Sequence, residues 1–308
     1  METQTKILVL CGGKFAFPTL QLLAYEKFIC GIGIGKASES IIDALEREAE
    51  DSNIGFKTFQ DKKSISGMRE WIDGIQPDYI FCISFPFLLP EKVLAYGEQK
   101  FINFHPAPLP QYRGSMPIFE VLKNQETETA ICAHFMNSAF DEGNIIFNDP
   151  VTIEAGDTYG KLTVKLSNRM AQVAFNMANM LAFASSIPNQ PQDELLAYYY
   201  EKPGLSDTYI NWNRMTTEEI IALINACNPW NGGADASLHG EQVKIIMASL
   251  LDEPHDNQPG TIVSVNNRIC IACRDDQQLA VEIISTDYGI MTAVQYSILH
   301  PEKTGVLN

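Results

Sequence analysis

Basic side chains are scarce in this 308-residue chain. It has 22 Lys and Arg residues against 38 Asp and Glu residues, which gives a formal net charge of −16 at pH 7. Affinity for nucleic acids comes largely from Lys and Arg side chains that neutralise phosphates. This balance therefore disfavours a nucleic-acid partner.

Long apolar runs are also missing. No uninterrupted run approaches the roughly 18 residues that span a bilayer, and the first residues lack the basic start and long apolar core of a signal peptide. We therefore expect no membrane partner and a cytoplasmic location. At 45% hydrophobic and 19% charged residues, the composition is that of a globular protein with a sizeable core.

Cysteine patterns typical of metal or disulfide frameworks are weak. The seven cysteines are scattered and odd in number, which indicates reduced thiols. Cys270 and Cys273 have metal or redox spacing, but there is no second such pair and no nearby histidine cluster. We interpret them as buried strand residues and expect no metal site.

The first part of the chain alternates apolar strand patterns with helical patterns. This alternation predicts an α/β fold with a doubly wound, mostly parallel, Rossmann-like sheet. Strands are expected at 6–11, 28–34, 78–84, 101–104, 129–136 and 144–153, and helices at 17–25, 38–51, 65–75 and 158–184. Ser38 is the expected N-cap of the second helix.

The remainder of the chain changes character. We predict a catalytic domain over residues 1–190, a linker over 191–207 and a carboxyl-terminal domain over 208–308. The last should contain a helix at 216–227 and short strands near 234–238, 243–249, 260–265, 269–273 and 279–285. Short strands separated by turns predict a small closed or half-closed, OB-like β-barrel.

The best candidate site combines one strand end with a later turn. Asn103 and His105 lie two apart on an expected strand and share a face, and prolines at 106, 108 and 110 force the chain out of the sheet just beyond them. His105 could move a proton with Asp141 as its carboxylate partner, and the Asn103 amide could stabilise an oxyanion. From the residues alone, acyl transfer and a structural loop with a chance aspartate both stay open.

Other motifs are less informative. Cys11-Gly-Gly-Lys14 follows the first strand but matches no established phosphate-loop pattern, so a tight turn with room for a ligand is favoured. No serine elbow or catalytic cysteine is evident. His134, His239, His255 and His300 are expected to be packing or surface residues.

At the candidate site the sequence resembles the N10-formyltetrahydrofolate-dependent formyltransferases. The shared motif comprises Asn103, His105, Leu109, Pro110, Tyr112, Arg113, Gly114, Asp141 and Gly143. Later segments, among them Asn228-Pro-Trp-Asn-Gly232, look like the second domain of methionyl-tRNA formyltransferases and of the aminoarabinose formyltransferase. The resemblance covers nearly the whole chain.

The resemblance implies a role for each group of residues. Asn103, His105 and Asp141 would be catalytic, and the formyl donor would be N10-formyltetrahydrofolate. The donor would be bound by Pro86, Phe87, Leu88, Leu89, Ala107, Pro108, Leu109, Pro110, Asn137, Ser138, Ala139 and Phe140. The acceptor would be bound by Gly12, Gly13, Lys14, Arg113, Gly114 and Ser115.

The acceptor is where this chain departs from its relatives. The tRNA enzymes carry a basic loop after the second strand, whereas here Lys36 leads directly into an acidic helix. The aminoarabinose enzyme uses an arginine at the position of Ser115. We therefore expect a small amine, with an amino sugar or nucleotide amino sugar as the leading candidate. The alternatives are initiator tRNA as the acceptor, hydrolysis of the donor by water, and a folate-binding module without turnover.

Overall fold

The computed structural model describes residues 4–238, 241–265 and 268–299. They form two compact units, each built from several stretches of chain. The first comprises Met1–Gly114, Glu128–Thr152 and Thr163–Tyr200; the second comprises Ser115–Thr127, Ile153–Leu162 and Glu201–Asn308. His239 and His300, interpreted above from sequence, lie outside the described residues.

The first unit contains a seven-stranded sheet with the order β3-β2-β1-β4-β5-β7-β8. Its first five strands are parallel, and β7 and β8 are added antiparallel at one edge. The expected doubly wound, mostly parallel sheet is confirmed. The strands are β1 (Ile7–Cys11), β2 (Ile29–Ile34), β3 (Gly55–Thr58), β4 (Tyr79–Ile83), β5 (Phe101–His105), β7 (Glu128–Phe135) and β8 (Ile145–Thr152).

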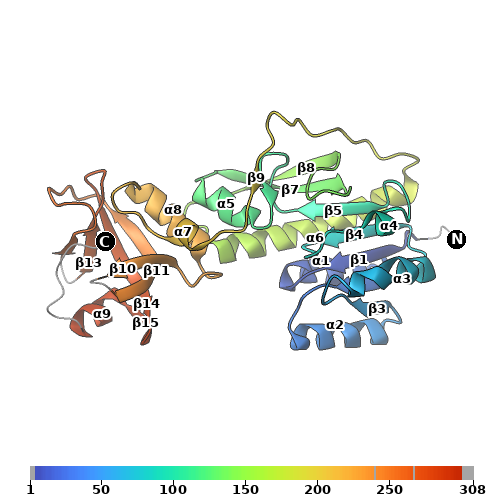
Figure 1. Cartoon of the computed structure of the whole chain (residues 1–308), viewed down its shortest axis with the longest axis horizontal. Helices are drawn as coiled ribbons and strands as arrows, with labels where there is room; N and C mark the ends of the chain where they lie inside the picture. Colours follow the sequence, from blue (N-terminus) through green and yellow to red (C-terminus); the bar gives the residue numbers. More distant parts are fainter. Residues whose placement is uncertain (1–3, 239–240, 266–267, 300–308) are drawn as a thin grey trace. The chain divides into compact units, whose positions relative to one another are not determined.

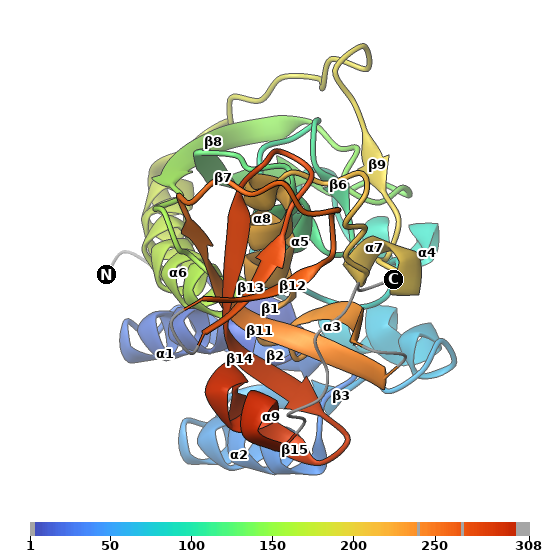
Figure 2. The same ribbon diagram turned by 90° about the vertical axis from the view of Figure 1, so that its left-hand side faces the viewer.

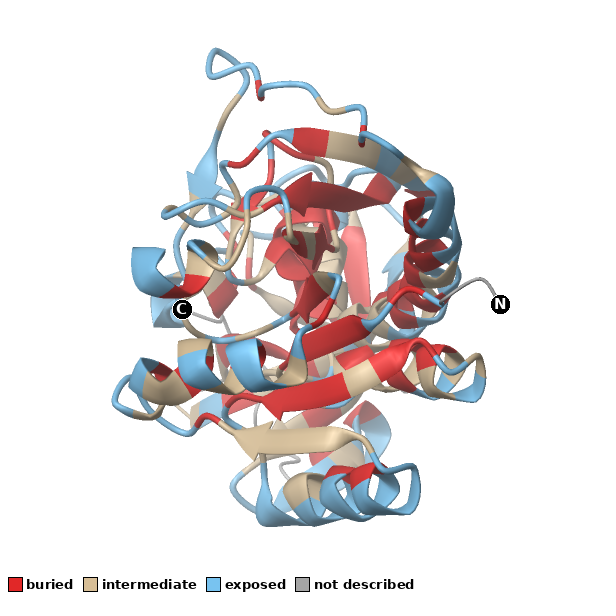
Figure 3. Ribbon diagram, turned by 90° about the vertical axis from the view of Figure 1, so that its right-hand side faces the viewer, coloured by how far each residue is buried: buried red, intermediate tan, exposed pale blue. Residues whose placement is uncertain are grey.

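Helices cover both faces of this sheet (Figure 1). Helices α1 (Phe17–Tyr25) and α6 (Tyr159–Phe183) lie on one side, and α3 (Met68–Ile75) lies on the other. Strand β1 is buried along its whole length, as expected for a central strand covered on both faces. Figure 3 shows the buried strands between helices whose outer sides are exposed. Shorter elements are η1 (Lys14–Ala16), η2 (Ser64–Gly67), α4 (Glu91–Leu94), β6 (Arg113–Gly114) and β9 (Tyr199–Tyr200).

Helix α2 (Glu39–Asp51) follows β2 after a short connection. Its buried positions are Leu45 and Ala49, four residues apart on one face. The exposed residues include six acidic ones, Glu39, Asp43, Glu46, Glu48, Glu50 and Asp51. Ser38 occupies the N-cap position, but its hydroxyl contacts that of Ser40 instead of capping the backbone. The expected start of the helix is confirmed and the expected capping contact is not.

The second unit contains an antiparallel sheet that forms a half-barrel (Figure 2). The strand order is β10-β11-β14-β13-β12, with β15 paired to β14. The half-closed alternative is therefore the one found, and β15 was not foreseen. The strands are β10 (Ala234–Leu238), β11 (Glu241–Leu251), β12 (Ile262–Val265), β13 (Arg268–Ala272), β14 (Gln278–Thr286) and β15 (Gly289–Thr292).

Helices α5 (Pro117–Lys123), α7 (Leu205–Thr208), α8 (Thr217–Cys227) and α9 (Ala293–Leu299) complete this unit. Helix α8 begins at a capping box, in which Thr216 Oγ1 accepts from the Glu219 N–H and Glu219 Oε2 accepts from the Thr216 N–H. Its buried residues include Ile220, Leu223, Ile224 and Cys227, the spacing of a core-facing stripe. Helix α8 packs against α5 and against β11.

Candidate active site

Strand β5 places two of the predicted catalytic side chains at one edge of the first sheet. Asn103 and His105 are two residues apart and therefore project from the same face. β5 pairs with β4 through Asn103 and with β7 through both residues. The prolines that follow prevent continuation of the strand, so His105 stands at its carboxyl end, where α/β sheets bind ligands.

Asp141 reaches this strand from the connection between β7 and β8. Its Oδ1 lies 3.5 Å from His105 Nδ1, and its Oδ2 accepts a hydrogen bond of 3.0 Å from the Gly114 N–H. The side chains of His105 and Asp141 are only 5% and 11% exposed. The structure thus brings together two residues that are 36 positions apart in the sequence, as the candidate site requires.

The hydrogen bonds of His105 define which of its nitrogens can exchange a proton. The Tyr112 carbonyl oxygen can only accept, so His105 Nε2–H donates to it across 2.7 Å. The other nitrogen, Nδ1, faces the Asp141 carboxylate. A proton can therefore be gained or lost at Nδ1 while the bond to Tyr112 keeps the ring in place.

His134 is a neighbour of the site that sequence reasoning treated only as a packing residue. In the antiparallel β5–β7 pair it lies directly opposite Asn103, and its Nε2 is 2.9 Å from Asn103 Nδ2 and 3.8 Å from Asp141 Oδ1. Nδ1–H of His134 donates to the Phe135 carbonyl oxygen, so Nε2 of the neutral ring accepts from the Asn103 amide. The contact between His134 and Asn103 follows from the register in which β5 and β7 pair, and the sequence alone does not reveal that register.

Burial keeps His134 in this neutral form. Removal of the ring from water lowers its pKa, and this effect outweighs the attraction of Asp141, which raises it. One N–H of the Asn103 amide is therefore held by an acceptor. The second N–H of the same amide is left to serve a ligand oxygen.

Cys132 lies opposite His105 on β7 but does not offer a thiolate. Burial raises the pKa of its thiol to about 12. Cys270 and Cys273 are likewise buried thiols that form no disulfide. Within residues 4–238, 241–265 and 268–299, no cluster of three or more His, Cys, Asp or Glu side chains could hold a metal ion.

The loops predicted to bind the donor differ in exposure. Leu88 and Phe140, from two separate loops, are 43% and 45% exposed, although both are large and apolar. Ala107, Leu109 and Pro110 are buried, and Leu89 belongs to the core. In the Asn137–Phe140 segment, Asn137 Oδ1 accepts from the Ala139 N–H.

The residues predicted to bind the acceptor fall into three groups. A Cβ atom at Gly12 would lie 2.3 Å from the Ser84 carbonyl oxygen, so the loop after β1 needs glycine to pass the loop after β4. Lys14 is exposed, and Ser115 is an exposed residue of the second unit. The Arg113 guanidinium is only 6% exposed and is bonded to Gln192 and Glu194.

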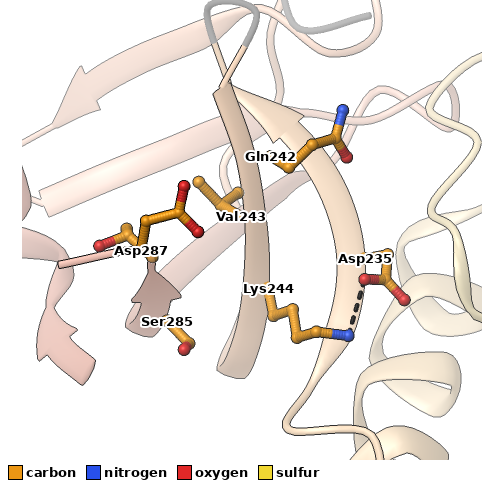
Figure 4. A pocket seen from close by; sticks show the side chains of 7 residues that line it. Asp235, Gln242, Val243, Lys244, Ser285 and Asp287 are labelled. Carbon is orange, nitrogen blue, oxygen red and sulfur yellow. Dashed lines mark hydrogen bonds and ion pairs between the residues drawn. The ribbon is translucent and has the colours of Figure 1, made fainter. Parts of the chain in front are cut away.

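A polar pocket of about 170 Å³ lies in the second unit (Figure 4). It is lined by Asp235, Gln242, Val243, Lys244, Ser285, Thr286 and Asp287. Lys244 Nζ donates to Asp235 Oδ1 across 2.7 Å, and Thr208 and Asn231 donate to the other carboxylate oxygen. The charges of Lys244 and Asp235 in this pocket therefore already satisfy each other.

The fold and the strand-end cluster define a class of enzyme that is confirmed by comparison with known proteins. Residues 33–176 match the formyl transferase family model, and residues 205–297 match the model of the formyl transferase carboxyl-terminal domain. The chain belongs to the formyl transferase family and is an N-formyltransferase. No helix in the part of the chain that the structure describes is long and apolar enough to cross a membrane.

Sequence relatives and structural neighbours point to different acceptors. The chain is 30% identical over 230 residues to the methionyl-tRNA formyltransferase of Stenotrophomonas maltophilia, with 74% of each chain covered, and 30% identical over 236 residues to that of Nitrosomonas eutropha, with 76% and 73% covered. Its fold is similar to that of the sugar 3N-formyl transferase WlaRD (TM-score 0.70, 19% identity, 91% and 97% covered). It is also similar to an N-formyltransferase of Helicobacter canadensis (TM-score 0.69, 17% identity, 90% and 99% covered).

Proposed function

We propose that this enzyme transfers a formyl group to the primary amine of a small acceptor, and that the acceptor is an amino sugar or a nucleotide amino sugar. The formyl donor is N10-formyltetrahydrofolate, which supplies the formyl group from its N10 nitrogen. The observation that carries the proposal is the cluster of Asn103, His105 and Asp141, with His134 holding the amide of Asn103.

The chemistry follows from these contacts. The acceptor nitrogen forms a bond to the formyl carbon, and the bond from that carbon to N10 breaks. Asn103 donates its second N–H to the formyl oxygen as negative charge develops there. His105 Nδ1, with Asp141 beside it, takes the proton released by the amine and returns it to N10.

The exposed apolar side chains of Leu88 and Phe140 support the assignment of their loops to the donor. A flat heterocycle needs apolar walls and backbone hydrogen-bonding groups, and exposed large apolar residues beside a polar cluster offer such walls. Leu88 precedes the core residue Leu89, and Phe140 precedes Asp141. The reactive end of the donor would thereby lie close to the catalytic carboxylate.

The choice of a small acceptor rests on charge. The six exposed acidic residues of α2 follow β2, where the tRNA enzymes carry a basic loop, and the whole chain has a net charge of −16. Each phosphate brought near such a surface is repelled within about 10 Å at 0.1 M salt. A nucleotide sugar carries two phosphates, whereas a tRNA acceptor stem presents many.

Charged initiator tRNA is the second candidate, because the relatives at 30% identity are methionyl-tRNA formyltransferases. The two readings are separated by incubating the purified chain and the donor with charged initiator tRNA or with a panel of nucleotide amino sugars, and measuring formylated product by mass spectrometry. We expect turnover on an amino sugar and none on tRNA. Formylation of tRNA alone, with a rate that falls steeply as salt rises, would reject the small acceptor.

The same assay tests the remaining alternatives. Formate released at the same rate with and without an amine would identify a hydrolase. A His105→Ala variant with an unchanged rate would identify a binding module. Reversal of two exposed charges on α2, Glu46→Lys with Glu50→Lys, serves as the control: formylation of a small acceptor should be unchanged, whereas a tRNA enzyme should bind its substrate more tightly.

A further inference from the structure

The segment Gln190–Tyr200, which we call the strap, crosses the catalytic edge of the first unit. At its start, Gln190 pairs with Ile145 through two backbone hydrogen bonds of 2.8 and 2.9 Å. At its end, β9 pairs in parallel with β6 through Arg113–Tyr199 and Gly114–Tyr200. The strap thus runs from the start of β8, just after the connection that carries Asp141, to β6, which carries the Gly114 N–H that binds the same carboxylate.

The Gln192 side chain bonds to both the β7–β8 connection and β6. Its Nε2 donates to the carbonyl oxygens of Asp141 and Gly143 across 2.7 and 2.8 Å. Its Oε1 accepts from Nε and Nη2 of Arg113 across 3.0 and 2.8 Å. Both donors and both lone pairs of the amide are used, and the residue is only 9% exposed.

The backbone of Asp141 requires such support. Its φ of +58° lies in the left-handed region, which costs a residue other than glycine on the order of 1 kcal/mol and persists only where neighbours hold it. Gln192 binds the carbonyl oxygen of that residue and the carbonyl oxygen two positions further on. Gln192 therefore fixes the direction in which the Asp141 side chain points.

We propose that Gln192 is a positioning residue for formyl transfer, which holds Asp141 in its left-handed conformation so that the carboxylate meets both His105 and the Gly114 N–H. The proposal rests on the role of Asp141 in the function proposed above. Arg113 supports Gln192. Its guanidinium donates to the Gln192 amide oxygen and so fixes the orientation of that amide, and it also donates to the Glu194 carboxylate. Because the strap meets the sheet that carries the catalytic strand at the edge strand β8 and not at β5, displacement of the strap would misplace Asp141 without disturbing β5.

Amide hydrogen exchange at Gly114, followed by NMR, reports the position of the carboxylate without any acceptor or turnover. Gln192→Glu keeps the oxygen that accepts from Arg113 and removes both donors to the β7–β8 connection. We expect Gly114 to exchange at least ~10-fold faster in this variant, as it should in Asp141→Ala, which removes the acceptor itself. Gln192→Met, of similar length and without polar atoms, should give the same result and replaces the first variant if that one does not fold.

Gln190→Glu is the matched control on the strap. It makes the same chemical change at an exposed residue whose pairing with Ile145 uses backbone atoms alone. Exchange at Gly114 should stay within twofold of the parent. Unchanged exchange in the Gln192 variants, with faster exchange in Asp141→Ala, would overturn the proposal.

Kinetics provide the second readout. Gln192→Glu should lower kcat at least ~10-fold and leave KM for the donor within about threefold. In the Asp141→Ala background the same change should cost less than twofold, because its effect passes through Asp141. Equal losses in both backgrounds would show a general structural role and refute the positioning role. If no acceptor is formylated by the parent, the proposed function fails while the exchange result still decides the role of Gln192.

Discussion

Replacement of Asn103 by leucine is the sharpest test of the catalytic assignment. Leucine is close in size to asparagine but has no N–H group. The change removes the proposed donor to the formyl oxygen, and loss of one such donor typically lowers kcat by about 10²–10³-fold, equivalent to about 3–4 kcal/mol in the transition state. KM for the donor should change little, because the contact strengthens only as charge develops.

The same substitution has a smaller effect on stability. His134 Nε2 loses the amide that it accepts from, and an unsatisfied buried acceptor costs about 1–3 kcal/mol. We therefore expect the free energy of unfolding to fall by about that amount, with a Tm lower by a few degrees, while the protein stays folded at assay temperature. A folded variant with a severe loss of kcat is the expected combination.

The assay measures initial rates of formylated product at saturating donor and acceptor, with thermal unfolding of the same samples. Asn148→Leu makes the same chemical change at an exposed position of β8 and should leave kcat unchanged. If Asn103→Leu keeps more than a tenth of the parental kcat, the amide does not stabilise the developing charge and the mechanism is wrong.

Three further results are expected. His105→Ala should lower the transfer rate at least ~100-fold while binding of a folate analogue, measured by calorimetry, persists; retention of most of the rate would remove His105 from the chemistry. Burial lowers the pKa of His134 in the folded protein. Below about pH 6.5 the unfolded chain therefore takes up a proton at this residue while the folded protein does not, so the free energy of unfolding should fall as the pH drops from 7 to 5. Urea titrations should show a weaker pH dependence in His134→Gln, and an identical slope would contradict this account. Gly143→Ala would bring a Cβ atom within 1.7 Å of the Phe135 carbonyl oxygen, so the free energy of unfolding should fall by about 1–3 kcal/mol and kcat should fall too. In the control Gly74→Ala the new Cβ atom meets nothing within 4 Å, and the free energy of unfolding and kcat should stay near the parental values.

Much of the fold was predictable because the strand and helix patterns are strong and local. The helix expected at 17–25 spans Phe17–Tyr25, and the long helix expected at 158–184 spans Tyr159–Phe183. Short or weakly patterned elements escaped detection: β6 and β9 have two residues each, and the strand character of Gly55–Thr58 depends on pairing with β2. Propensity over two to four residues carries too little information to define a strand.

The amino-acid sequence by itself was sufficient to predict that Asn103 and His105 share one face of a strand, since alternation along a strand places them there whatever surrounds them. It was also sufficient for the net charge of −16, on which the proposal of a small acceptor rests. The tertiary structure alone decided that His134 faces Asn103, that Arg113 is buried against Gln192 and Glu194, and that the strap meets Asp141. These contacts depend on strand register and on segments distant in sequence, and a one-residue shift in pairing would have reversed which side chains face the site.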